Sequence, residues 1–146
     1  MSEDKFFKQY LTAQVVAASA HKGQRRRGSD TPYIVHPKRT AKRAEKLFGR
    51  CFKRSAIAML HDVLEDTELT HLDLLNKHID EEIIYVVTLL TRKPDQDQQE
   101  YLNTIKRSTY AIEVKIADML DNLSDNPTRK QLRKYAAAIT ELEACL

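Results

Sequence analysis

The chain has 146 residues, with 24 Lys and Arg against 21 Asp and Glu, and it contains only 3 Gly, 4 Pro and no Trp. A hydrophobic fraction of 42% beside 31% charged residues is ordinary for a globular protein and excludes the apolar-poor composition of a disordered chain. So few glycines and prolines disfavour the many tight turns of a β-sandwich or β-barrel. We therefore expect helices, in a single domain over residues 1–146.

Helical spacing of the apolar residues predicts a first amphipathic helix over residues 3–21. A loop rich in Gly, Ser and Pro then runs to His36, with a short extended piece over residues 33–35. Pro37 can occupy the first position of the next helix, where its missing N–H is no loss. The later helices are predicted over residues 37–48, 53–66, 71–76, 81–93, 96–110, 111–123 and 127–144. The sequence thus indicates a compact all-α bundle of about eight helices.

The longest apolar runs fall far short of the roughly 20 residues that a membrane-spanning helix needs. The first residues are acidic and lack the basic region and apolar run of a secretory signal. Cys51 and Cys145 are too few for a disulfide framework and lack the spacing of a metal site. We therefore expect a cytoplasmic chain without a membrane partner.

The net charge of +3 hides an uneven distribution of charged residues. Residues 22–54 carry 12 Lys and Arg against two acids, a net charge of +10, so the rest of the chain carries −7. This asymmetry favours an anionic partner: a nucleic acid, a membrane surface or a phosphorylated small molecule. Over residues 38–46, where basic residues alternate with apolar ones, we favour instead the solvated face of a helix.

The most informative segment, Leu60–Asp66, places four ionisable residues in an apolar helical run. In a continuous helix, His61 and Glu65 share one face, and Asp62 and Asp66 share the neighbouring face. An imidazole beside a carboxylate can bind a divalent cation, and two carboxylates on the next turn can orient water or move a proton. The segment therefore predicts a metal site with acid–base groups beside it.

Two other stretches strengthen the prediction of a metal site. His36 lies between apolar residues at the start of a predicted helix, and Lys115, Asp118 and Asn122 share one helix face. A set of two histidines and two aspartates favours a first-row divalent ion over calcium, whose ligands are oxygens. Such a set leaves coordination positions for water and substrate.

The order of these residues resembles the metal-binding pattern of the HD-domain phosphohydrolases. More narrowly, four blocks of the chain are similar to the hydrolase domain of the RelA/SpoT homologues and to the stand-alone small alarmone hydrolases. These blocks are His21–Arg26, Pro32–Pro37, His61–Asp66, and Lys115–Asp118 with Asn122. The Glu65–Asp66 pair is the specific part of the resemblance.

The resemblance implies an HD-type helical fold and a metal-dependent hydrolase. Its substrates would be guanosine tetra- and pentaphosphate, from which it removes pyrophosphate at the ribose 3′ position to give GDP or GTP, with Mn²⁺ as the usual ion. The residues implied to hold one divalent ion are His36, His61, Asp62 and Asp118. Glu65 and Asp66 would activate and position the attacking water. The residues implied to bind substrate are Arg26, Arg25, Lys115, Asn122 and Tyr135.

Two departures from the family pattern concern the substrate. Met119 stands where the family has an arginine after the aspartate, and Asp121 adds an acid next to Asn122. A related HD phosphohydrolase that acts on NADPH or on a nucleoside monophosphate is therefore an alternative. A third possibility is a noncatalytic module that binds nucleotides or nucleic acid through the basic segment. Such a module would not need the four metal ligands that the sequence carries. We expect a small guanine nucleotide as partner rather than a nucleic acid, and a homo-oligomer stays open.

Overall fold

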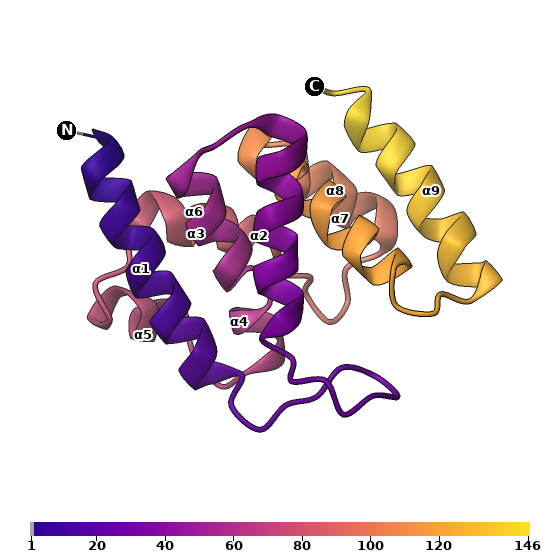
Figure 1. The fold of residues 1–146 in the computed structure, drawn as a ribbon. Coiled ribbons are helices and arrows are strands. Elements are labelled where there is room, and N and C mark those ends of the chain that lie inside the picture. Colours follow the sequence, from indigo (N-terminus) through magenta and orange to yellow (C-terminus); the bar gives the residue numbers. More distant parts are fainter. Residues whose placement is uncertain (1) are drawn as a thin grey trace.

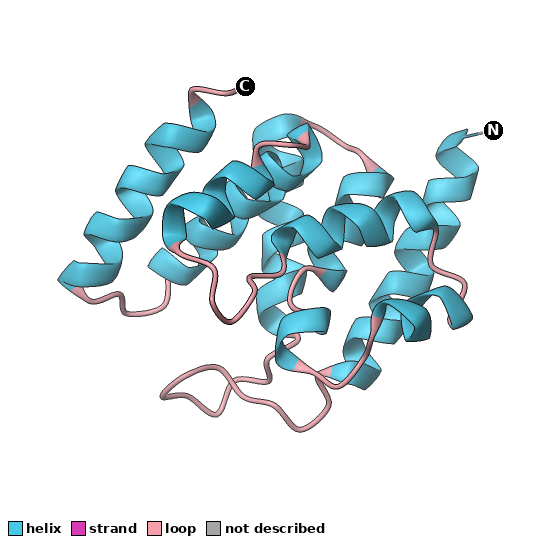
Figure 2. Cartoon of the chain, turned by 180° about the vertical axis from the view of Figure 1, so that it is seen from behind, coloured by secondary structure: helices cyan, strands magenta, loops and turns pink. Residues whose placement is uncertain are grey.

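The computed structural model describes residues 2–146 and is all-α, as composition and periodicity predicted (Figure 1). In this range the helices are α1 (Ser2–Ala20), α2 (Val35–Phe48), α3 (Phe52–Leu60), α4 (Val63–Asp66), α5 (His71–Asn76), α6 (Glu81–Leu90), α7 (Gln98–Ile105), α8 (Thr109–Leu123) and α9 (Arg129–Glu143). Figure 2 shows loops between the helices and no strand in the described range; one isolated β-bridge joins Arg25 to Pro32. Within residues 2–146, no helix is both long and apolar enough to cross a membrane.

Helix α3 lies at the centre of the bundle. The side chains of residues 56–60 are fully buried, because this short apolar helix is covered from several sides. Helix α1 packs against α3, α2 packs against both α3 and α8, and α9 packs against α8 (Figure 1). Helices α2, α3 and α8 are therefore neighbours in space although they lie far apart in the sequence.

The helix predicted over residues 53–66 is interrupted, and this part of the prediction is wrong. Helix α3 ends at Leu60 and α4 begins at Val63, with His61 and Asp62 in the turn between them. Asp62 has φ −101° and ψ −4°, away from regular helical values. Local helix propensity does not encode the interruption; the two turn residues instead contact side chains of α2 and α8.

The start of α2 differs from the prediction. The helix begins at Val35 rather than at Pro37, so the extended piece predicted over residues 33–35 is wrong. Pro37 still lies in the first helical turn, where an N–H has no partner within the helix and its loss removes no hydrogen bond. The earlier start turns His36 toward α8 as a residue of the helix itself.

The long helix predicted over residues 96–110 is also wrong in its bounds, since α7 covers only Gln98–Ile105. The reason is Ser108, whose side chain accepts a hydrogen bond from the backbone N–H of Ala111 and caps α8. A helix that begins at Thr109 cannot continue from α7 through its own cap. Ser108, which follows α7, thus fixes the residue at which α8 begins.

Candidate metal centre and active site

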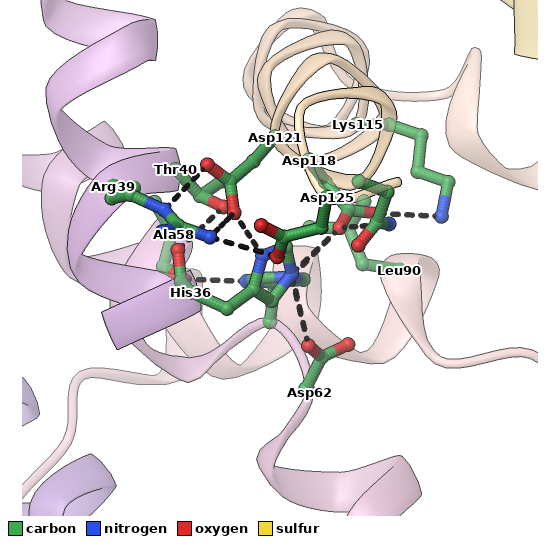
Figure 3. A network of polar contacts seen from close by, with 12 residues as sticks. His36, Arg39, Thr40, Ala58, Asp62, Leu90, Lys115, Asp118, Asp121 and Asp125 are labelled. Atoms are coloured by element: carbon green, nitrogen blue, oxygen red, sulfur yellow. Dashed lines mark hydrogen bonds and ion pairs between the residues drawn. The ribbon is translucent and has the colours of Figure 1, made fainter. Parts of the chain in front are cut away.

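Four side chains from three parts of the chain meet between α2, α3 and α8 (Figure 3). His36 comes from α2, His61 and Asp62 from the turn after α3, and Asp118 from the middle of α8. Each offers one ligand atom, and these atoms all lie within 4.8 Å of one another. Asp62 is half-buried and the other three are buried. The four residues predicted as metal ligands are thus brought together.

The distances show two imidazole nitrogens facing two carboxylate oxygens. Asp118 Oδ1 lies 2.9 Å from His36 Nε2 and 3.3 Å from His61 Nε2. Asp62 Oδ2 lies 3.1 Å from His61 Nε2 and 3.5 Å from His36 Nε2. A set of two nitrogens and two oxygens suits a first-row divalent metal ion.

The far nitrogen of each histidine is held by an acceptor. His61 Nδ1 donates to the Ala58 carbonyl at 2.6 Å, and His36 Nδ1 donates to Asp121 Oδ2 at 2.7 Å. Each Nε2 is therefore left facing the cluster, the arrangement that metal-binding histidines need. His61 Nε2 is buried and makes no hydrogen bond within residues 2–146. An orphaned nitrogen of this kind fits a bound cation.

In the cluster, the effect of opposite charges on the pKa values outweighs the effect of burial. Burial alone would lower the pKa of His61, but the carboxylates of Asp62 and Asp118 raise it well above its usual range. Burial would likewise raise the pKa of Asp118, but Lys115 and His61 lower it well below the usual range. Protons and a metal ion therefore compete for the same nitrogen lone pairs.

An acidic pair lies beside the four ligands. Carboxylate oxygens of Asp62, Glu65 and Asp66 lie within 4.8 Å of one another, and both Glu65 and Asp66 are exposed. Glu65 Oε1 accepts from the backbone N–H of Arg92 at 2.7 Å. Partial burial and the charge of Asp62 raise the pKa values of both Glu65 and Asp66. A carboxyl group with a raised pKa is suited to accept a proton near neutral pH.

Three of the predicted substrate residues reach the same centre. Lys115 Nζ donates to Asp118 Oδ2 at 2.8 Å, and Asn122 Nδ2 donates to Asp118 Oδ1 at 3.1 Å, as their helical spacing predicted. Arg26 Nη2 donates to Asn122 Oδ1 at 3.1 Å. A pocket of about 300 Å³ beside Arg26 is also lined by Asp125 and Asn126.

The other two predicted substrate residues are not joined to the cluster. Arg25 is exposed and lies in the bridge to Pro32. Tyr135 is half-buried on α9 and packs against the apolar core. Within the described residues, neither side chain hydrogen-bonds to the four ligands. Their proximity to a bound nucleotide stays a prediction.

Local sequence patterns did not predict a place in the site for Tyr33, Asp121, Arg39 or Arg43. Tyr33 Oη donates to Asp62 Oδ2 at 2.6 Å and lies 3.3 Å from Asp66 Oδ2. Asp121 contacts His36 and both arginines. Two sequence signals could have pointed to these residues: the three-residue spacing from Tyr33 to His36, and that from Asp118 to Asp121. The prediction of a merely solvated basic helix face is therefore wrong for Arg39 and Arg43, which pair with a buried acid.

Two curated relatives match most of the chain. One is the guanosine-3′,5′-bis(diphosphate) 3′-pyrophosphohydrolase of Borreliella burgdorferi, 32% identical over 128 residues, which are 80% of this chain and 19% of the relative. The other is the probable enzyme of that name from Mycoplasma pneumoniae, 30% identical over 118 residues, which are 70% of this chain and 16% of the relative. The chain thus spans less than a fifth of the length of these relatives. No protein-family model matches the sequence.

A solved structure matches the fold. It is a metazoan ortholog of SpoT, described as hydrolysing ppGpp and playing a role in starvation responses. The TM-score is 0.74 at 25% identity, and the match covers 92% of this chain and 84% of the other. The structure thus defines an all-helical domain with a candidate His/Asp metal site, and its fold is that of the metazoan ortholog of SpoT. In sequence, the chain is similar over most of its length to the two guanosine-3′,5′-bis(diphosphate) 3′-pyrophosphohydrolases.

Proposed function

We propose that the chain is a metal-dependent hydrolase that removes pyrophosphate from the ribose 3′ position of guanosine tetra- and pentaphosphate. The observation that carries this proposal is the convergence of His36, His61, Asp62 and Asp118 beside the acidic pair Glu65–Asp66. The relatives named for this reaction, and the ortholog described as hydrolysing ppGpp, support the choice of substrate. The products are GDP or GTP, and the reaction takes place on free nucleotides in the cytoplasm.

In this proposal the four clustered side chains hold one divalent ion, Mn²⁺. When bound, the ion polarises the phosphoryl group and lowers the pKa of a coordinated water. The protein contributes the donor set and its orientation, because acceptors at Ala58 and Asp121 hold each histidine with Nε2 toward the centre. Asp62 is half-buried and belongs to both groups of ligand atoms, so it joins the centre to Glu65 and Asp66.

Glu65 and Asp66 activate and orient the attacking water. The oxygen of that water bonds to the phosphorus at the ribose 3′ position, the bond from this phosphorus to the ribose oxygen breaks, and the ribose oxygen leaves with a proton from solvent. Glu65 takes a proton from the water, and Asp66, which lies 3.3 Å from Tyr33 Oη, orients the water. The raised pKa of Glu65 makes its carboxylate a better proton acceptor than a glutamate with the usual pKa.

The remaining residues bind the nucleotide. Arg26 lies at the 300 Å³ pocket and hydrogen-bonds to Asn122, so the two can hold a base or ribose beside Asp118. Lys115 places a positive charge next to the cluster, where phosphates would come. Arg25 and Tyr135 complete the proposed set from the rim.

The test is release of pyrophosphate from guanosine tetraphosphate with and without Mn²⁺. We expect Mn²⁺ to stimulate turnover, and His61→Ala and Glu65→Ala to abolish it. Glu81→Ala is the matched control, because Glu81 is exposed in the first turn of α6 and lies outside the cluster. Cleavage of NADPH or nucleoside monophosphates with guanosine tetraphosphate left intact would show that the substrate is wrong. Tight binding of RNA with steep salt dependence and no turnover would instead identify a binding module.

A further inference from the structure

A buried carboxylate outside the four candidate ligands touches one of them. Asp121 lies on α8, one turn after Asp118, and none of its surface is exposed. Its Oδ2 accepts a hydrogen bond from His36 Nδ1 at 2.7 Å (Figure 3). The two residues are 85 positions apart in the sequence, so this contact exists only because α2 packs against α8.

Two arginines of α2 keep Asp121 in its charged form. Arg39 Nε and Arg43 Nε donate to Asp121 Oδ1 at 2.8 Å and 3.0 Å, and Arg39 Nη2 donates to Oδ2 at 3.1 Å. An unpaired buried carboxylate would be costly, and these charge-assisted bonds offset the cost.

The charge of Asp121 dictates where the protons of His36 sit. A carboxylate anion can only accept hydrogen bonds, so a bond from His36 to Asp121 requires a proton on Nδ1. His36 Nε2 lies 2.9 Å from Asp118 Oδ1, and a metal ion bound there would replace any proton on that nitrogen. The imidazole would then be neutral, with its proton on Nδ1 and its lone pair on Nε2. That nitrogen is the atom of His36 that faces Asp62 and Asp118.

We propose that Asp121 is a positioning residue, which orients His36 and selects the tautomer that binds the metal ion through Nε2. This inference rests on the metal site of the proposed function. Asp121 does not itself contact the ion. It acts on His36 as the Ala58 carbonyl acts on His61, but with a full negative charge that also makes His36 a stronger donor to the metal.

The test is a titration of the full chain with Mn²⁺, in which the electron paramagnetic resonance signal of free Mn²⁺ reports binding. We expect Asp121→Asn to weaken Mn²⁺ affinity by about 10- to 100-fold, the range for partners of metal-bound histidines. The same substitution in a His36→Gln background should cause no further loss, because the residue through which Asp121 acts is gone. Equal losses in both backgrounds would overturn the proposal.

Asp95→Asn is the matched control for a general loss of negative charge. Asp95 is exposed in the loop between α6 and α7 and belongs to neither candidate metal group. We expect this variant to keep the Mn²⁺ affinity of the unmodified protein. A loss as large as that of Asp121→Asn would assign the effect to net charge and contradict the proposal.

A measurement on the unmodified protein covers the case in which Asp121→Asn fails to fold. Long-range ¹H–¹⁵N nuclear magnetic resonance of the Zn²⁺-loaded chain should show the His36 proton on Nδ1 and the metal at Nε2. The opposite tautomer would overturn the proposal. If His61→Ala binds Mn²⁺ as tightly as the unmodified chain, the metal site and the proposed function fail instead, whatever Asp121 does.

Discussion

At the scale of single residues, one hydroxyl group joins a candidate ligand to the acidic pair. Tyr33 Oη donates its proton to Asp62 Oδ2 at 2.6 Å, and the same oxygen lies 3.3 Å from Asp66 Oδ2. We expect Tyr33→Phe to weaken Mn²⁺ binding by roughly 10-fold or more, since the bond goes to a charged oxygen in a ligand. Tyr85→Phe is the control on an exposed tyrosine. Equal Mn²⁺ affinities in calorimetric titrations of the two variants would contradict this role.

The raised pKa of Glu65 predicts the pH dependence of turnover. A proton acceptor works only when deprotonated, so activity should fall as the pH drops through the pKa of Glu65. Partial burial and the charge of Asp62 raise this pKa above the usual value for glutamate, which is about 4.3. The loss of activity should therefore begin at a higher pH than it would with an ordinary glutamate. Profiles of kcat against pH at saturating Mn²⁺ measure the pH at which activity falls. Glu65→Gln should lose about 10²- to 10⁴-fold in kcat, whereas Glu68→Gln should keep the profile.

The residues of the centre show which parts of a site a sequence can reveal. His61, Asp62, Glu65 and Asp66 are neighbours in the chain, so their chemistry was visible as one segment. The spacing from Asp118 places Asp121 near a candidate ligand, but the contact from Asp121 to His36 joins two helices far apart in sequence, so local spacing does not reveal this partner.

At the scale of helices, a buried ion pair ties α3 to α8. Arg54 Nη1 lies 2.7 Å from Glu113 Oε2, both residues are buried, and Arg54 also donates to the carbonyl of Gly49. Arg54→Ala should destabilise the fold by about 3–5 kcal/mol, because it leaves a buried carboxylate unpaired. Urea unfolding measures this loss. Lys53→Ala, which breaks the more exposed pair with Glu82, should cost about 0–1 kcal/mol. Equal losses would contradict the prediction.

Most helices could be predicted from periodicity and caps, because those signals are local. Thr70 caps α5 with Asp73 in a capping box, and Asp80 caps α6, as their positions before apolar segments indicated. The break at His61 and Asp62 could not be predicted in this way, since these two residues contact side chains of α2 and α8 across the bundle. The local pattern there is that of one continuous helix.

At the scale of the whole molecule, the candidate ligands join three helices, so a bound ion should stabilise the entire bundle. A free Mn²⁺ concentration of 100 times the dissociation constant adds about 2.7 kcal/mol to the free energy of unfolding. For a chain of this size, this corresponds to a rise in Tm of roughly 5–10 °C. Thermal unfolding with Mn²⁺ and with a chelator measures the shift. His61→Ala should show none, and a full shift in that variant would place the ion elsewhere.

The packing of α2 against α8 also affects how the protein matures during synthesis. His36, His61 and Asp62 leave the ribosome early, whereas Asp118 and the helix that carries it follow much later. A nascent chain that ends after α7 therefore holds only three of the four candidate ligands, and its His36 lacks Asp121. The candidate metal site is therefore complete only after α8 has docked, so binding of a cation by all four residues would be coupled to completion of the fold.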